Sequence, residues 1–201
     1  MRFKVIHTRH YPRSRVRAMQ NGMLALFISL FLSSASAAQF SADEVKAVYL
    51  FNFTSFITWP EDTFKKPSDP FTYCSFDNKG AVTKPLGEIL LGEKVNERAV
   101  KFKTITKISD IKGCQVLYID QLQHTNIEEI LRKTKVMPIL TVSDINGFAK
   151  QGGAVEFSTK GGRIKLLINV SKIKDARLNV SSKLLRIADL INSPSEADEP
   201  W

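Results

Sequence analysis

Two short, mainly apolar runs, residues 115–120 and residues 137–142, constrain the fold of this chain more than any other feature. Strands that are covered on both faces carry such runs, because neither face of an interior strand meets water. Between the runs, Ile127, Ile130 and Leu131 lie at helical spacing. A strand–helix–strand order implies a right-handed crossover between two parallel strands. The sequence therefore predicts a sheet with a parallel interior.

The first part of the chain predicts a long helix followed by alternating strands and helices. Ser41 and Glu44 have the spacing of a capping box, which begins the helix. Pro60 ends it, because the residue before a proline avoids the α region. Asn52 is polar among apolar residues of this helix, so we expect it to be buried and hydrogen-bonded. The next predicted elements are a strand over residues 71–76, a helix over 81–91 that stops at Gly92, and a strand over 99–105.

The last part of the chain predicts a hairpin and a final helix. Residues 154–159 and 164–170 flank the segment Lys160-Gly161-Gly162-Arg163, whose glycines allow the positive φ angles of a tight turn. A helix is predicted over residues 181–191 from the spacing of its apolar residues. Helices that alternate with strands and a closing hairpin predict a three-layer α/β domain with a mixed sheet flanked by helices.

Residues 1–38 have the pattern of a cleaved secretory signal. Six basic residues precede an apolar run over 23–32 and a string of serine and alanine over 33–38. The apolar run is short for a membrane span, which takes about 20 residues; a retained anchor is the alternative. We expect export to the periplasm, a single domain over residues 39–192, and a disordered acidic tail over 193–201.

The positive charge of the chain comes mostly from this leader. The chain has 29 Lys and Arg against 20 Asp and Glu, a net charge of +9. Six of the basic residues and none of the acidic ones lie in residues 1–38, which leaves 23 basic residues and a net charge of +3 in the mature protein. No basic block remains, and a nucleic-acid interface needs a concentrated basic face. Nucleic acid is therefore not an expected partner.

The two cysteines, Cys74 and Cys114, either pair with each other or both stay free. An oxidising compartment favours the disulfide, and two buried thiols are the alternative. Cys74 falls in the first predicted strand, and Cys114 directly precedes the run 115–120. A disulfide requires Cα atoms about 5.5 Å apart. The bond would therefore require these two strands to be neighbours or their ends to converge.

No catalytic or cofactor-binding pattern stands out. The mature chain has one histidine, His124, and lacks the Gly-x-Ser-x-Gly pattern of a nucleophile elbow. Neither a dinucleotide-binding glycine pattern nor a phosphate-binding loop follows a predicted strand. Two cysteines and one histidine also lack the number and spacing of metal ligands. We predict no catalytic residue, no metal site and no cofactor.

An ordered set of motifs over the whole mature domain resembles the YfiR family of bacterial periplasmic proteins. The motifs are Val45-Lys46-Ala47-Val48-Tyr49-Leu50-Phe51-Asn52-Phe53 with Trp59-Pro60, residues 92–98, Cys114-Gln115-Val116-Leu117-Tyr118-Ile119, Leu140-Thr141-Val142-Ser143-Asp144, Gly147-Phe148, Gly152-Gly153, Glu156-Phe157, Asn169, Ala176, Leu178, and Ser181-Ser182-Lys183-Leu184-Leu185.

The resemblance implies a truncated Rossmann-like fold without catalytic activity. It also implies repression of a membrane-bound diguanylate cyclase through the periplasmic sensory domain of that enzyme, which lowers cyclic di-GMP and biofilm formation. An outer-membrane lipoprotein is a second implied partner. By this resemblance, Cys74 and Cys114 look like one of the two disulfide pairs of YfiR. The other pair would fall near residues 147–157, where this chain has no cysteine, so redox control through that pair is not expected.

Three residues are candidates for binding a partner or ligand: Phe148, Phe157 and Asn169. Phe148 lies in a glycine-punctuated loop, and exposed loop aromatics often anchor interfaces. Its alternative is a loop side chain that folds back onto the sheet. Asn169 is either a ligand contact or a structural hydrogen-bonding residue, because buried amides are usually satisfied locally.

The leading functional hypothesis is a regulatory binding protein for an inner-membrane signalling protein, with a diguanylate cyclase as the expected partner and a homodimer as one oligomeric state. The alternative is a periplasmic small-molecule sensor or accessory protein for another receptor, such as a histidine kinase. A Rossmann-like sheet would offer such a sensor a crevice at the carboxyl ends of its strands. A hydrolase that uses His124 ranks last.

Overall fold

The computed structural model describes residues 40–76 and 80–191, so the predicted signal over 1–38 and the predicted tail over 193–201 lie outside the described residues. No helix in the described part of the chain has the length and apolar character that a membrane crossing requires. The helices and strands are α2 (Ala42–Asn52), β1 (Ile57–Thr58), β2 (Phe71–Phe76), α3 (Thr83–Ile89), β3 (Lys94–Val95), β4 (Arg98–Thr104), β5 (Val116–Ile119), α4 (Ile127–Thr134), β6 (Leu140–Ser143), β7 (Val155–Lys160), β8 (Arg163–Asn169), α5 (Val170–Asp175), β9 (Asn179–Val180), α6 (Ser182–Leu185) and β10 (Asp189–Ile191).

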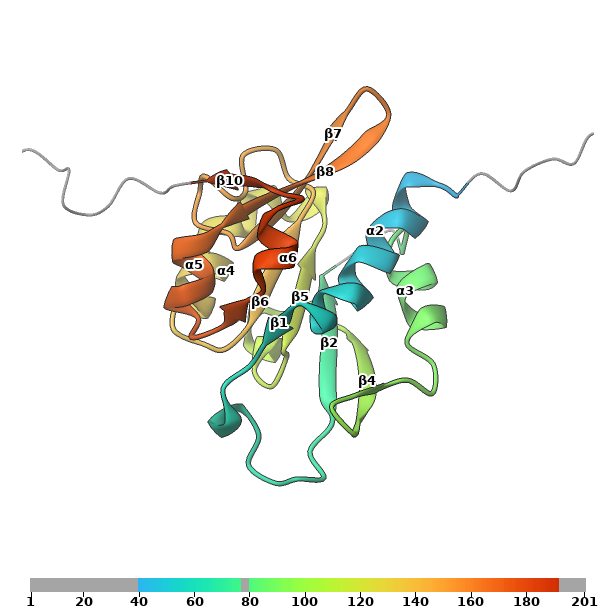
Figure 1. Ribbon diagram of the computed structural model, residues 1–201, viewed down its shortest axis with the longest axis vertical. Helices are drawn as coiled ribbons and strands as arrows, with labels where there is room; N and C mark the ends of the chain where they lie inside the picture. The colour runs from blue at the N-terminus through green and yellow to red at the C-terminus, as the bar shows by residue number, and fades with distance from the viewer. Residues whose placement is uncertain (1–39, 77–79, 192–201) are drawn as a thin grey trace, which may run out of the picture. The chain divides into compact units, whose positions relative to one another are not determined.

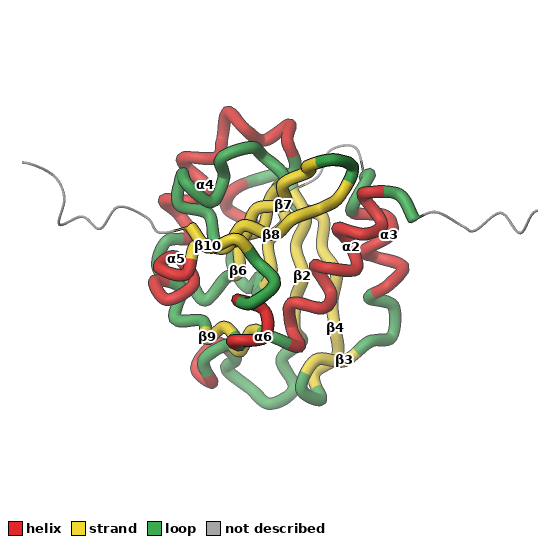
Figure 2. Tube along the Cα trace, turned by 45° about the horizontal axis from the view of Figure 1, so that its top comes forward, coloured by secondary structure: helices red, strands yellow, loops and turns green. Residues whose placement is uncertain are grey.

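The main sheet has eight strands in the order β10-β8-β7-β6-β5-β2-β4-β3 (Figures 1 and 2). The five strands β4, β2, β5, β6 and β7 run parallel to one another, and β5 and β6 pair in register from Val116 with Leu140. β7 and β8 form the predicted antiparallel hairpin, in which Gly161 (φ +59°) and Gly162 (φ +72°) make the turn. The sheet is therefore mixed with a parallel interior, as predicted.

Helices cover both faces of this sheet, and β5 shows why. Val116 and Tyr118 belong to one buried cluster, which also takes in residues of α2, α3 and α6. Leu117 and Ile119 point the other way, into a second cluster with residues of α4. Since successive side chains of a strand alternate between faces, a strand covered on both sides must be apolar throughout. The three-layer α/β architecture predicted from the sequence is confirmed.

The amino-terminal helix begins as predicted but is shorter. In α2 the Ser41 hydroxyl accepts a hydrogen bond from the Glu44 amide (3.2 Å), and the Glu44 carboxylate accepts one from the Ser41 amide (2.7 Å). The regular helix ends at Asn52 and a 3-10 turn, Phe53–Ser55, follows. Asn52 is exposed. The prediction that Asn52 is buried is therefore wrong, because the helix turns this position toward solvent.

The predicted final helix over residues 181–191 is wrong in its second half. The helix α6 stops at Leu185, and residues 189–191 form β10, which pairs in parallel with β8 from Asp189 opposite Leu167. Hydrogen bonding to the open edge of β8 outweighs the helical spacing of the apolar residues, since tertiary context overrides a weak local preference. The predicted strand over 164–170 likewise ends at Asn169, where α5 begins.

Candidate functional site

Cys74 and Cys114 form a disulfide that joins two neighbouring strands. Cys74 lies in β2, and Cys114 comes two residues before β5, which pairs in parallel with β2. The Cα atoms of the two cysteines are 5.8 Å apart, and the side chains are 1% and 2% exposed. The predicted adjacency of the two strands is confirmed, and the bond lies within the core shared with α4.

The three candidate binding residues are all buried. Phe148 is 0% exposed, Phe157 is 2% exposed and Asn169 is 0% exposed. Phe148 is therefore a loop residue packed onto the sheet, and the expectation of an exposed aromatic is wrong. Phe157 stacks on Phe53 of the adjacent 3-10 turn with ring centroids 6.1 Å apart. A binding role for these residues stays a prediction that would require their loop and helix cover to open.

Asn169 has a structural task that explains its burial. Its Nδ2 donates a hydrogen bond to the Ala149 carbonyl (2.8 Å), and its Oδ1 accepts one from the Lys172 amide (3.1 Å). The second bond caps α5, because an Asn oxygen satisfies one of the amides that a helix start leaves without a partner. The first bond fixes the loop before β7. Asn169 therefore connects the end of β8 to two segments at once.

Glu156 fixes the same loop, and the sequence analysis did not assign it this role. Its carboxylate is buried, with Glu156 3% exposed, and accepts hydrogen bonds from the amides of Gly147 (3.1 Å) and Ala149 (3.0 Å). The ring of Phe148 lies so close to Gly153 that a Cβ atom there would overlap it. A charged residue inside the apolar run of β7 was the available signal, since buried carboxylates need strong donors.

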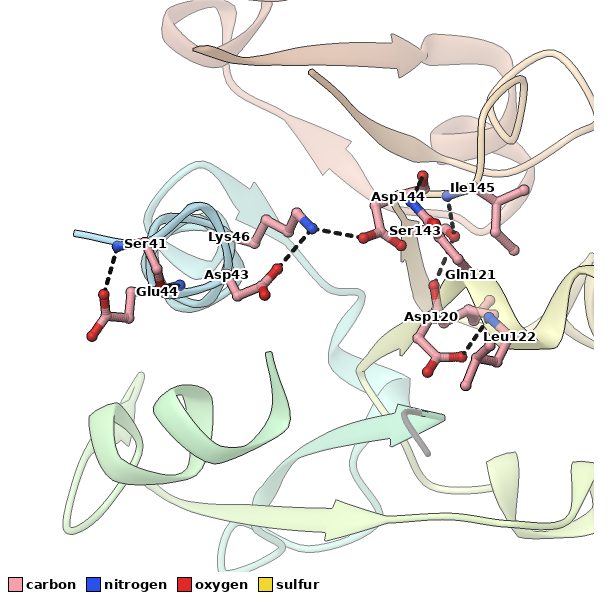
Figure 3. Close-up of polar contacts among 11 residues, drawn as sticks. Ser41, Asp43, Glu44, Lys46, Asp120, Gln121, Leu122, Ser143, Asp144 and Ile145 are labelled. Carbon is pink, nitrogen blue, oxygen red and sulfur yellow. Dashed lines mark hydrogen bonds and ion pairs between the residues drawn. The ribbon is translucent and has the colours of Figure 1, made fainter. Parts of the chain in front are cut away.

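The carboxyl ends of β5 and β6, where a Rossmann-like sheet would bind a ligand, are occupied by local contacts (Figure 3). Ser143 donates a hydrogen bond to the Ile119 carbonyl (2.7 Å) and accepts one from the Ile145 amide (3.0 Å). Asp120 accepts a hydrogen bond from the Leu122 amide (3.1 Å). These side chains join the strand ends to the loops that follow them.

The side chain of Lys46, from α2, reaches the carboxyl end of β6, as Figure 3 shows. Its Nζ lies 2.7 Å from the Asp144 carboxylate and 2.9 Å from that of Asp43. The Lys46 and Asp144 side chains are 10% and 11% exposed, whereas Asp43 is 40% exposed. Burial alone lowers the pKa of Lys46, but hydrogen bonds and attraction to the two carboxylates, first Asp144, outweigh it and raise that pKa above its ordinary value. The pair holds α2 against the end of β6.

Replacing Lys46 with Met should lower the free energy of unfolding by about 3 kcal/mol, because the Asp144 carboxylate would stay buried without its cation. Since the pKa of Lys46 is raised, its contribution is present below about pH 10.5 and is lost as the pH rises through the higher folded-state value. Urea unfolding at pH 7 and pH 11 measures both effects.

Lys101→Met is the matched control for this substitution, because Lys101 lies on β4 and is exposed. It should change the free energy of unfolding by less than about 0.5 kcal/mol. Adding Asp144→Leu to Lys46→Met should recover part of the loss, since removing both charges is far less costly than removing one. Equal effects of Lys46→Met and Lys101→Met would show that the buried pair does not stabilise the fold.

The described residues bring together no group of three His, Cys, Asp or Glu side chains that could hold a metal ion. The buried carboxylates instead accept hydrogen bonds from backbone amides or from Lys46. His124 falls in a 3-10 segment, Gln121–Asn126, and its side chain lies outside the described part of the structure, so the hydrolase hypothesis stays untested. The polar side chains at the carboxyl ends of β5 and β6 hold α2 and the following loops in place.

Comparison with known proteins identifies the family. A family model described as YfiR/HmsC-like matches residues 43–189. No curated protein matches the sequence. One similar solved structure is a substrate-binding protein with adhesive properties from Clostridium difficile, in its ligand-free, open form (12% identity, TM-score 0.46, covering 64% of this chain and 56% of that one).

A second similar solved structure is a conserved domain protein from Vibrio cholerae (13% identity, TM-score 0.47, covering 77% of this chain and 61% of that one). The chain thus spans less than two thirds of either structure, and neither likeness supports an inference about it. The family model, by contrast, covers both faces of the sheet and every strand of its parallel interior. The chain therefore belongs to the YfiR/HmsC-like family.

Proposed function

We propose that the protein is a non-catalytic periplasmic regulator. It binds the periplasmic sensory domain of an inner-membrane diguanylate cyclase and represses that enzyme, which lowers cyclic di-GMP and biofilm formation. The observation that carries this proposal is the family match over residues 43–189. The family suggests a regulator of this enzyme class, and the cyclase and the repression are the step that we add.

Two features support the compartment that the proposal requires. Residues 1–38 have the basic, apolar and small-residue order of a secretory signal. Cys74 and Cys114 are paired, and disulfides persist in oxidising compartments such as the bacterial periplasm. Export would place the protein on the same side of the inner membrane as a sensory domain. An outer-membrane lipoprotein that sequesters the regulator would have access to the same space.

The surface available for this contact differs from the one predicted from the sequence. Phe148 and Phe157 are buried, so they cannot anchor a partner in this conformation. Leu190 of the terminal strand β10 and Ile187 in the turn just before it are, by contrast, 50% and 66% exposed. Exposed apolar side chains beside a sheet edge are suited to a protein contact, because an edge strand offers backbone donors and acceptors as well. We assign the regulatory contact to this edge.

Deleting the gene should raise cellular cyclic di-GMP, because the cyclase would lose its repressor, and expression of the intact chain should restore the lower level. A chain with Ile187→Asp and Leu190→Asp should fail to restore it, because two carboxylates would be desolvated in the contact. The measurement is cyclic di-GMP by mass spectrometry in each strain, alongside the amount of each protein in the periplasm.

Leu91→Asp is the matched control, since Leu91 is 85% exposed and belongs to the turn after α3. This variant should restore repression as the intact chain does. Unchanged cyclic di-GMP in a deletion strain whose parent demonstrably makes the protein would rule out repression of a diguanylate cyclase. Full repression by the Ile187→Asp, Leu190→Asp chain would place the contact elsewhere on the surface.

A further inference from the structure

A groove of about 550 Å³ lies between α4 and α5, away from the carboxyl ends of the strands. One stripe of α4 lines it, including Leu131 and Arg132, together with Lys172 of α5. Its floor is at the amino-terminal side of β6 and β7, where Thr141 and Ala154 line it. The volume is in the range of small-molecule sites in proteins, about 300–1,000 Å³.

The groove exists because β7 pairs only with the second half of β6, so the first residues of β6 do not pair with it. Their register begins at Val142 opposite Val155. One residue earlier, the Ala154 amide donates a hydrogen bond to the Thr141 hydroxyl (3.1 Å) and not to a backbone carbonyl of β6. Because the Thr141 hydroxyl satisfies the buried Ala154 amide, the strands can separate here without leaving that amide unpaired. The groove is therefore present in the folded protein, and no backbone movement is needed to open it.

The lining combines an apolar floor with a positive rim. Ile139, Ala154 and Ala176 are 4%, 2% and 5% exposed and supply apolar surface. Arg132 and Lys135 are exposed at the rim, and within the described part of the chain neither side chain makes an ion pair.

The remaining charges limit what the rim can bind. Lys172 is paired with Asp175 (3.0 Å), which neutralises it. Glu128 is the one carboxylate in the lining. The two unpaired cations and this carboxylate leave one net positive charge, which matches a ligand with one negative charge.

We propose that this groove binds an amphipathic monocarboxylate, with its apolar body on the floor and its carboxylate on Arg132 and Lys135. A guanidinium matches a carboxylate through two parallel N–H donors, which favours this anion over an uncharged polar head. A single net charge does not match a polyanion. A protein partner is disfavoured, because a stable contact needs about 800 Å² from each side, whereas a groove of about 550 Å³ has the size of a small-molecule site. The inference does not depend on the cyclase.

Decanoate is a suitable probe, because it has one carboxylate and an apolar chain. Calorimetric titration of the purified protein should show saturable binding of one decanoate per chain. Decanol, which has the same chain without the charge, should bind at least about tenfold more weakly. The double substitution Arg132→Gln with Lys135→Gln should weaken decanoate binding by about tenfold or more, since hydrogen bonds to charged groups contribute that much.

Lys133→Gln is the matched control, since Lys133 is an exposed cation on the same helix and does not line the groove. Its affinity for decanoate should equal that of the unchanged protein, and circular dichroism should show that all variants are folded. Three results would each overturn the proposal: no saturable decanoate binding, equal affinity for decanoate and decanol, or equal affinities of the Lys133→Gln protein and the double variant. All three are measured on purified protein and require no cyclase.

Discussion

Removing the Cys74–Cys114 disulfide is expected to lower the free energy of unfolding by about 4 kcal/mol. The two cysteines are 40 residues apart in sequence, so the bond closes a long loop and restricts the unfolded chain. In the folded state it joins β2 to the segment that enters β5, and these are central strands of the main sheet. A loss of this size is a large part of the 5–15 kcal/mol by which a typical domain is stable, at roughly 25 °C.

Urea unfolding of the oxidised and the reduced protein measures this effect without changing any side-chain volume. The substitution Cys74→Ala with Cys114→Ala should cost somewhat more, because both side chains are buried and alanine leaves small cavities. Thiol labelling of the denatured, unreduced protein should find no free cysteine. If reduction leaves the unfolding midpoint unchanged but releases a bound partner, the disulfide is a redox switch and its structural role is disproved.

The interior of the sheet was predictable because its sequence signal is local. The run that forms β5 is apolar at every position, and the structure sends Val116 and Leu117 to opposite, equally buried faces. The capping box at Ser41 was predictable for the same reason, since both of its hydrogen bonds span three residues. The motifs that resemble the YfiR family include β5, and the family assignment agrees with that resemblance.

The parts that could not be predicted depend on contacts between distant residues. The helical spacing over residues 181–191 gives no sign that β8 has an open edge to which β10 can bind. Lys46 and Asp144 are 98 residues apart, and neither position alone indicates an ion pair. The groove was missed because it depends on where β6 and β7 begin to pair, which the sequence does not fix.

The loop over residues 144–153 shows the same limit at the candidate binding residues. Its glycines suggested an exposed recognition loop, which is the usual place for such residues. Glu156 and Asn169 instead bind its backbone from β7 and from the end of β8. With its amides and carbonyls satisfied, the loop can be buried, and Phe148 can enter the second core. The motif that looked like a binding loop is therefore a packing unit.

Replacing Phe148 with Ala is expected to lower the free energy of unfolding by about 4 kcal/mol, since a fully buried phenylalanine leaves a large cavity. Gly153→Ala should cost about 1–3 kcal/mol, because its methyl group would overlap the Phe148 ring. The double variant should cost less than the sum of the two, because the methyl group of Ala at position 153 would occupy part of the space left by the ring. Urea unfolding of the four proteins gives the coupling.

Phe40→Ala is the matched control, since Phe40 is 71% exposed. It should change the free energy of unfolding by less than about 0.5 kcal/mol, as surface substitutions usually do. Equal effects of Phe40→Ala and Phe148→Ala would show that the ring of Phe148 is not buried in solution. Additive effects of Phe148→Ala and Gly153→Ala would show that the ring and the glycine are not in contact. Only the first of these two results would make Phe148 available again as a recognition residue, because only there would the packing that removes its ring from the surface be absent.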